Sequence, residues 1–199
     1  MASPQTFQPS DKDTGIRIAA KDTNYSTLTA MYLRKSANSI QRNVIAFDIS
    51  DLPAGVTISS AKLSLYFYVA NATSGLQVDV FKQTRDDWVE TEVTWNSYKT
   101  GSAWTTEGGD YVTSSPAGAD TVFPVSYDWM DWEIKDIAID AVANVGSIVN
   151  LLVKYNDETG ADGYGGFYTR KYANTALRPK LVINYSVATT TSPLPTFHK

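Results

Sequence analysis

The sequence predicts an all-β domain: a sandwich of two antiparallel sheets with one short helix. Turn-forming residues divide the chain into short runs rich in β-branched and aromatic residues. Aromatic residues make up 12% of the chain, with twelve tyrosines against seven phenylalanines, which suits strands that have one face in water. The length of 199 residues fits one domain of the large sandwich type, which buries enough surface to fold without disulfides.

Several runs are predicted strands, and seven or eight strands of this kind are enough for a sandwich. They are residues 30–35, 42–49, 61–69, 76–83, 148–156, 165–172 and 179–187. The third run alternates most clearly. Leu63, Leu65 and Phe67 are predicted to face the core, whereas Tyr66 and Tyr68 point to the other face.

One segment has helical rather than β periodicity. Apolar residues recur three and four positions apart from Ile134 to Val145, and Gly146 follows as a C-cap, so one short helix is predicted there. Residues 100–124, rich in Gly, Ser, Thr and Ala, are predicted to form a long loop. Loops of that length are often functional.

The predicted β-sandwich domain comprises residues 11–186. Residues 1–10 are predicted to be an N-terminal extension, and residues 187–199 a Thr/Ser/Pro-rich tail of the kind that acts as an extended linker. Such a linker predicts a neighbouring domain in a larger protein, the alternative being an ordinary frayed terminus. No apolar run approaches the ~20 residues that span a bilayer, and no signal peptide is evident, so no membrane insertion is expected.

Composition narrows the function classes. The chain has no cysteine, and therefore no disulfide, thiolate nucleophile or thiolate metal ligand. The net charge of −4 argues against a nucleic-acid-binding protein. The charge is unevenly distributed, because residues 1–50 have six Lys/Arg against four acids and residues 166–199 have five against none. Residues 51–165 have six against seventeen, so the ends are basic and the middle is acidic.

Four stretches in order carry a family resemblance. They are DTGIRI with DTNYSTLTAMYL, RNVIAFDISDLPAGVTISSAKLSLY, WVETEVTWN, and FYTRKYANTALRPKLVINY. Together they resemble the DNRLRE domain family, which is close to the disaggregatase-related repeats of methanogenic archaea and to a carbohydrate-binding-module family associated with alginate. The most specific match is FDISDLPAGVTISSAKLSL, a strand, a Leu-Pro-x-Gly turn and a second strand.

The resemblance implies a jelly-roll β-sandwich on a secreted or cell-surface protein. The sequence departs from the family pattern at three positions. Ser26 stands where a glycine is usual, Ala46 where an arginine is frequent, and Lys171 where an acid often follows the arginine. The last two departures change the surface charge, so the ligand need not be that of other members.

The stretch DWVETEVTWN has a catalytic and a structural interpretation. Glu90 and Glu92, two apart on a strand, would share one face, but a glycosidase needs two carboxyls at a fixed separation across a cleft. No motif marks a partner, and the resemblance makes this stretch a structural signature of a loop bent onto the sandwich. We therefore predict that Trp88 and Trp95 pack at the sheet edge and that Glu90 and Asn96 bond backbone amides of the bend.

Other enzyme chemistry has little support. His198 is the only histidine and lies in the tail, so a Ser-His-Asp arrangement and a histidine zinc site are not expected. A polysaccharide lyase that uses Tyr with Arg or Lys, or a glycoside hydrolase, is the alternative. The prediction is a protein that is not an enzyme and that requires no cofactor.

Two acidic loops are candidates for a structural calcium ion. One contains Asp11 and Asp13, and the other contains Asp157, Glu158 and Asp162. Loop carboxylates are the ligands that calcium prefers, and jelly-roll binding modules often carry the ion by family analogy. Neither loop has the spacing of a complete EF-hand, and the alternative is solvated turn residues with Asx-turn bonds.

The basic ends carry the binding prediction. The first and last strands of a jelly roll commonly lie side by side, so basic side chains far apart in sequence are predicted to form one positive strip. Arginine matches carboxylate and sulfate groups, and tyrosines on the strand parity of Arg170 are predicted to stack on sugar rings. The predicted strip contains Arg17, Arg34, Arg42, Arg170, Lys180, Tyr168 and Tyr172.

Each of these arginines has an alternative role as a solvated edge residue or as the partner of an internal acid, and Arg178 is expected to be structural. Trp104, Trp129 and Trp132 are either sugar platforms or core residues, and the Trp129 and Trp132 pair is predicted to be core.

The sequence as a whole predicts a non-catalytic carbohydrate-binding module of an extracellular or cell-surface protein, with an anionic polysaccharide as its partner. The alternative class is a structural or adhesive spacer module that has no glycan site.

Overall fold

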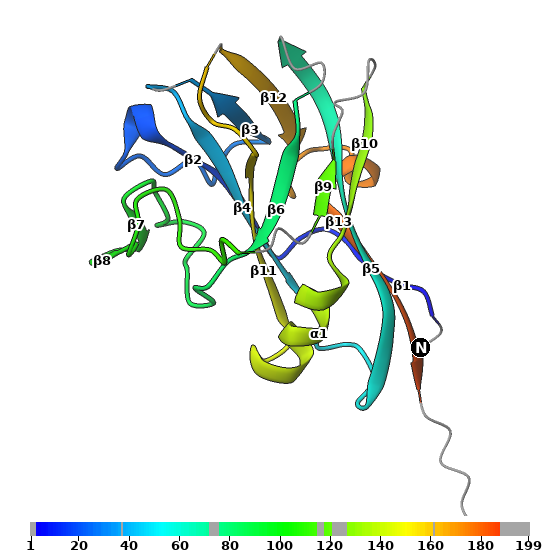
Figure 1. Cartoon of the computed structure of the whole chain (residues 1–199). Helices are drawn as coiled ribbons and strands as arrows, with labels where there is room; N and C mark the ends of the chain where they lie inside the picture. The colour runs from blue at the N-terminus through cyan, green and yellow to red at the C-terminus, as the bar shows by residue number, and fades with distance from the viewer. Residues whose placement is uncertain are drawn as a thin grey trace, which may run out of the picture.

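The fold was analysed in a computed structural model, which describes residues 3–36, 38–71, 76–114, 118–120, 127–160 and 162–187 (Figure 1). The predicted tail beyond Val187, including His198, and parts of the predicted loop at 100–124 lie outside the described residues.

The described residues form thirteen strands. They are β1 (Gln5–Phe7), β2 (Lys12–Arg17), β3 (Ala30–Lys35), β4 (Gln41–Asp48), β5 (Val56–Asn71), β6 (Val78–Lys82), β7 (Ser97–Lys99), β8 (Ser102–Ala103), β9 (Gly118–Asp120), β10 (Asp128–Glu133), β11 (Ile148–Tyr155), β12 (Gly163–Tyr168) and β13 (Lys180–Val187). Within the described ranges there is one α-helix, α1 (Lys135–Asn144), and two 3₁₀ turns, Ile18–Ala20 and Thr175–Leu177. The prediction of an all-β domain with one short helix is confirmed. No described helix has the length and apolar character needed to cross a membrane.

Eleven of the strands form one curled antiparallel sheet. Its order is β1-β13-β5-β12-β3-β4-β11-β6-β9, with β10 beside β5 and β2 beside β4, and β7 and β8 pair separately. The sequence predicted two sheets, but the structure has one continuous sheet, because Arg34 near the end of β3 pairs with Gln41 at the start of β4. The predicted extension also belongs to the sheet, since Gln5–Phe7 pairs with β13.

The larger core cluster lies inside the curl. Its residues come from β3, β4, β5, β6 and β10 to β13, and α1 lies between β5 and β11 at one end (Figure 1). Trp132 is one of the largest side chains in it, 2% exposed, and its indole Nε1 donates to the Val78 carbonyl at 3.0 Å. The buried indole therefore leaves no polar group unpaired.

A second, smaller cluster covers the outer face of β4 and β11. On β11, Leu151 and Val153 belong to the inner core whereas Leu152 belongs to this outer cluster. The segment after β6 lies over it and contributes Trp88 and Trp95, both buried. Because β11 is buried on both faces, it has a nearly continuous apolar sequence rather than an alternating one.

Candidate functional site

The outer face of β5 and β12 carries a set of aromatic rings, called here the tyrosine row. Tyr168 is parallel to Tyr172 at 3.5 Å between ring centroids and to Tyr68 at 4.3 Å. Tyr66 and Trp129 continue the row towards β10, edge to face at 5.4 Å. The row consists of the half-buried rings of Trp129, Tyr66, Tyr168, Tyr172, Tyr68, Tyr32 and Tyr164.

Strand alternation positions the row. Tyr66 and Tyr68 point away from the core, as predicted, while the residues between and beside them on β5 are buried or half-buried. β12 pairs with β5 and brings Tyr168 beside these two rings. Gly166 on β12 leaves room for Tyr32 of β3, because a Cβ at that position would lie 2.9 Å from Tyr32 Cε1. A glycine is therefore needed for the two strands to carry large rings side by side.

Part of the row is stacked, whereas Tyr32, Tyr164 and Trp129 meet their neighbours tilted or edge to face. Tyr168 stacks with Tyr172 on one face and with Tyr68 on the other, so both faces of its ring are covered. The hydrogen bond to Tyr172, followed by burial, raises the pKa of Tyr168 to about 12. The Tyr32 and Tyr68 hydroxyls are 2.6 Å apart. Arg178 has the expected structural role, since its Nε donates to the Tyr172 carbonyl at 2.7 Å. The expectation that Tyr168 offers a free face to a sugar ring is therefore corrected.

A hollow of about 220 Å³ adjoins the row where β2, β3 and β4 meet, called here the cationic hollow. The guanidinium of Arg17 lies 3.8 Å from the centroid of the Tyr25 ring and has no carboxylate partner among the described residues. Its Nε and the Gln41 Oε1 are buried without a hydrogen-bond partner. Arg34 binds Asp162 through two bonds of 2.8 and 2.6 Å, but both side chains are at least 36% exposed. The hollow is lined by Arg17, Tyr32, Arg34, Gln41 and Tyr164.

Arg42 does not belong to an open strip. Its guanidinium is 11% exposed and binds Glu158 through two bonds of 2.8 Å. A third bond, also 2.8 Å, runs to the Gly108 carbonyl, and the Trp95 ring centroid is 5.0 Å away. The expectation of a solvent-open guanidinium at Arg42 is wrong, because the acidic middle of the chain supplies an internal partner for it.

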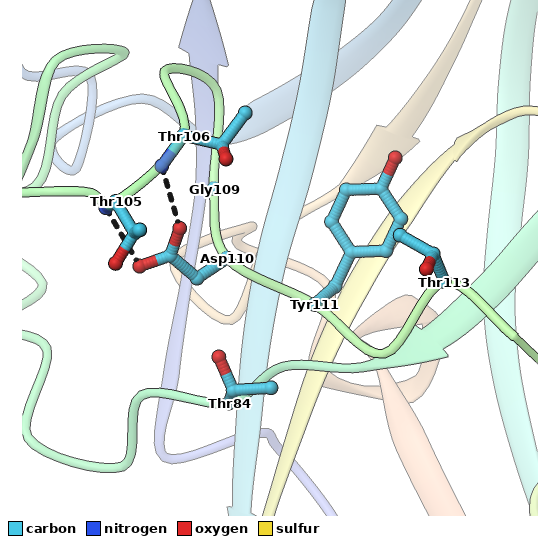
Figure 2. Close-up of a pocket in the computed structure, with 7 residues that line it drawn as sticks. All are labelled: Thr84, Thr105, Thr106, Gly109, Asp110, Tyr111 and Thr113. Atoms are coloured by element: carbon cyan, nitrogen blue, oxygen red, sulfur yellow. Dashed lines mark hydrogen bonds between the residues drawn. The ribbon is translucent and has the colours of Figure 1, made fainter.

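A second hollow, of about 320 Å³, lies on the segment that covers the outer cluster (Figure 2). We call it the threonine hollow. Its lining residues are Thr84, Thr105, Thr106, Gly109, Asp110, Tyr111 and Thr113. It shares no lining residue with the cationic hollow. Sequence reasoning predicted a long loop of a length that is often functional at residues 100–124, but named none of these residues.

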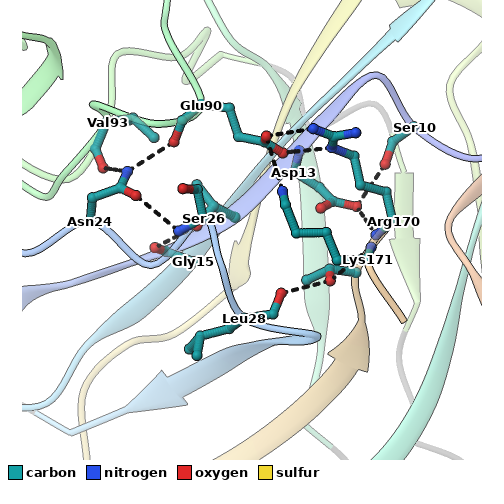
Figure 3. Close-up of polar contacts among 12 residues, drawn as sticks. Ser10, Asp13, Gly15, Asn24, Ser26, Leu28, Glu90, Val93, Arg170 and Lys171 are labelled. Atoms are coloured by element: carbon teal, nitrogen blue, oxygen red, sulfur yellow. Dashed lines mark hydrogen bonds and ion pairs between the residues drawn. The ribbon is translucent and has the colours of Figure 1, made fainter. Parts of the chain in front are cut away.

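Glu90 is the centre of a buried polar network (Figure 3). It is 7% exposed and accepts two bonds from Arg170, of 2.8 and 2.7 Å, and one of 3.0 Å from the Asp13 amide. The ammonium of Lys171 lies 3.0 Å from it. Burial alone would raise the pKa of Glu90, but these cationic and amide donors outweigh it and lower the pKa to about 2. An internal acid thus binds Arg170, so the expectation that this arginine belongs to an open strip is wrong.

Asp13 lies in the same network with the opposite electrostatic behaviour. It is 1% exposed, and its Oδ2 accepts bonds of 2.6 Å from the Ser10 hydroxyl and from the Arg170 amide. Its Oδ1 is buried without a partner. Burial is the main cause that raises the pKa of Asp13 to about 6, and the neighbouring charge of Glu90 adds to it. The pKa values of Asp13 and Glu90 are well separated, but neither carboxyl lines a described hollow.

The bend that contains Glu90 is fixed by side chains that sequence reasoning did not identify. The Asn24 amide donates to the carbonyls of Glu90 and Val93, both at 2.8 Å. The Thr94 hydroxyl accepts the Asn96 amide at 3.2 Å. The Asn96 side chain, which was expected to bond the bend, donates instead to a carboxylate of an earlier loop at 2.8 Å. Trp88 and Trp95 are packed as expected, but on the outer face of β4 and β11. Glu90 accepts a backbone amide as expected, but that of Asp13 on β2 and not one of the bend, which Asn24 holds instead.

The remaining tryptophans divide between core and surface. Trp132 and Trp104 are buried, 2% and 5% exposed. Trp129 is half-buried at the end of the tyrosine row, with the Lys180 ammonium 3.7 Å from its ring centroid. The prediction that Trp129 and Trp132 are both core residues holds only for Trp132, because neighbouring odd and even positions of β10 face opposite sides.

The five candidate calcium ligands are separately engaged, and Glu158 is the one that binds Arg42. Asp11 accepts the main-chain amide at the end of β4, and Asp157 accepts the amide two residues further on. Asp162 holds a guanidinium group, and Asp13 lies in the buried network. Across the described ranges, no group of three His, Cys, Asp or Glu side chains could hold a metal ion. The expected grouping of oxygen ligands is not found in that part of the chain.

Comparisons with known proteins identify a family. The disaggregatase related repeat domain matches residues 13–183, nearly the whole described sheet. No curated protein matches the sequence. Among solved structures, the chain is similar to the crystal structure of the infectious bursal disease virus VP2 subviral particle, with a TM-score of 0.26 and 12% sequence identity. That match covers 90% of this chain and 39% of the viral chain.

Proposed function

Because the chain belongs to the disaggregatase related repeat domain family, we propose that it is a non-catalytic module that binds an acidic polysaccharide at the cell surface or outside the cell. Within that family we place it beside the DNRLRE domains, as a jelly-roll sandwich that is one module of a larger protein. The support for the binding role is a surface on which tyrosines of the row adjoin Arg17, a cation that has no carboxylate partner among the described residues.

The cationic hollow is the observation that carries the proposal. Arg17 has a guanidinium with a buried, unpartnered Nε, and a buried polar group without a partner costs about 1 to 3 kcal/mol. A carboxylate or sulfate of a sugar would satisfy it through the planar donor fork of the arginine. Arg34 adds a second cation, and its exposed pair with Asp162 is worth at most about 1 kcal/mol, so a ligand can replace it.

The tyrosine row would extend the site along a sugar chain. Neighbouring rings cover both faces of Tyr168, which favours hydrogen bonding between tyrosine and sugar hydroxyls over stacking on a free ring face. At the far end, the Lys180 ammonium over Trp129 supplies another cation. A shallow site of this kind binds one chain at about micromolar to millimolar Kd, and repetition of the module would raise the avidity.

We predict that Arg17→Ala weakens binding to uronate polymers by about tenfold or more, because it removes a charge-assisted hydrogen bond. Affinity electrophoresis in gels with alginate, pectin or chondroitin sulfate, at low and high salt, measures this. Lys99→Ala is the matched control. Lys99 lies on β7 and pairs with Asp87 at the surface, so the variant also removes one positive charge. Both variants should keep the unfolding midpoint of the parent. Equal retention of parent and Arg17→Ala would refute the assignment.

A second candidate function, a structural or adhesive spacer, is favoured by one observation. Two of the predicted binding arginines, Arg42 and Arg170, are bound to internal carboxylates and stabilise the module rather than a ligand. Failure of the parent to be retained on any acidic or neutral polymer would select the spacer role.

A further inference from the structure

We infer that the threonine hollow is a second glycan site, which takes an uncharged pyranose unit. The inference does not rest on the function proposed above, because the two hollows share no residue. Figure 2 shows Asp110 at the floor, with Thr84 and the Thr105–Thr106 pair around it and the Tyr111 ring beside Thr113.

The floor of the hollow is preorganised. Asp110 Oδ1 accepts the Thr106 amide at 2.8 Å, and Oδ2 accepts the Thr105 amide at 2.9 Å (Figure 2). Gly109 has a φ of 106°, and a Cβ there would lie 2.4 Å from Leu152 Cδ1 of the outer cluster. A side chain is therefore excluded at the point where the loop turns onto β11, and the loop is held against the sheet.

The rim is rich in hydroxyl groups that have no partner among the described residues. The side chains of Thr84, Thr106 and Thr113 are exposed, and their hydroxyls form no hydrogen bond with any described residue. The same holds for the hydroxyl of half-buried Tyr111. Each hydroxyl can donate one bond and accept two, so the rim complements a ligand that is itself covered with hydroxyls.

The charge of the hollow selects the ligand class. Burial alone would raise the pKa of Asp110, but bonds from Thr105, Thr106 and Arg85 outweigh it and lower the pKa. The carboxylate is therefore ionised, and Arg85 lies beside it at 3.4 Å. One anion with one neighbouring cation leaves no net charge to attract an acidic ligand, which favours an uncharged ligand that bonds the threonine hydroxyls.

An aromatic wall completes the match to a pyranose. Tyr111 is supported by Phe81 at 4.8 Å between ring centroids and by the Arg42 guanidinium at 5.8 Å. A ring held in place from behind can contact the C–H face of a sugar while the threonines bond its hydroxyls. The buried Arg42 thus has a positioning role here.

The location implies simultaneous occupancy of both hollows. Gly109 rests on Leu152, which faces outward from β11, whereas the tyrosine row faces outward from β5. The inner core lies between these two strands. The two hollows are lined by different residues, so one module could hold an acidic chain and a neutral chain at the same time.

The test uses cellohexaose, laminarihexaose and mannohexaose as probes, with isothermal titration calorimetry on the whole chain. At least one probe should bind the parent, and the double variant Thr84→Val/Thr113→Val should bind it at least tenfold more weakly. Thr57→Val is the matched control, because Thr57 is an exposed threonine on β5 away from the hollow, and it should retain the parent affinity. Unfolding midpoints verify that each variant is folded.

Two further measurements separate the sites. Arg17→Ala should leave neutral-probe binding unchanged, and alginate should not compete with the bound probe. The inference is overturned if no probe binds the parent, if the double variant keeps the parent affinity, or if Arg17→Ala abolishes neutral binding. Loss of acidic-glycan binding alone would bear only on the cationic hollow.

Discussion

Glu90→Ala is expected to lower the free energy of unfolding by about 3 kcal/mol at pH 7, because it removes the carboxylate that pairs with Arg170 and Lys171. Loss of one member of a buried ion pair costs about 3 to 5 kcal/mol, and the lower end applies because both cations are about one-third exposed. The Asp13 amide also loses its acceptor. For a chain of this size the unfolding midpoint should fall by about 6 to 12 °C.

The control for this prediction is Glu107→Ala, which breaks an exposed pair with Lys21 and should cost less than about 1 kcal/mol. A double-mutant cycle of Glu90→Ala with Arg170→Ala should give a coupling energy above about 1 kcal/mol. Equal stability of Glu90→Ala and Glu107→Ala in urea unfolding would show that the network is not structural. It would also reopen the catalytic interpretation of Glu90.

Local pattern was enough for much of the fold. β3 has the predicted bounds, and the alternation of Tyr66 and Tyr68 against buried neighbours predicted the exposed face of β5. β10 was missed because two aspartates in DWMDWE have low strand propensity, although its alternate positions are buried. β2 was missed because Asp13 and the threonine after it are buried polar residues, which periodicity does not count as core.

The site was predicted less well, because charge partners depend on contacts between distant segments. Glu90 and Arg170 are 80 residues apart, and Arg42 and Glu158 are 116 apart. The sequence shows that both ends are basic, but which arginine meets which acid is decided by strand order. Arg17 was named as a candidate, and of the arginines in the predicted strip it is the one without a carboxylate partner among the described residues. The neighbours of Arg17 in the hollow, Gln41 and Tyr164, carry no signal in one sequence.

The second large effect expected is a pH dependence of stability that Asp13 controls. Its pKa in the fold is about 6, above its ordinary value of 3.8, so the native state holds the proton more tightly than the unfolded chain. Stability from this group is fully present below pH 3.8 and is lost as the pH rises through 6. The loss amounts to about 3 kcal/mol.

Glu90 acts in the opposite direction. Its pKa in the fold, about 2, lies below its ordinary value of 4.5, so its contribution is present above pH 4.5 and is lost as the pH falls through 2. The two carboxyls together should give a maximum of stability near about pH 4, with a fall on either side. The two pKa values shift in opposite directions within one network. Most of the cationic donors contact Glu90, whereas burial dominates at Asp13.

Asp13→Asn should remove the fall in stability between pH 4 and 6, since the amide cannot ionise. The variant should be less stable than the parent at pH 4, because its NH₂ would replace the buried Oδ1 that has no partner. By pH 7.5 that deficit should shrink by about 3 kcal/mol. Urea unfolding followed by tryptophan fluorescence at several pH values measures this, with Asp157→Asn, an exposed turn aspartate, as the control that should keep the parent profile. A parent-like fall in Asp13→Asn would mean that another group titrates in this range, and that Asp13 does not carry the proton.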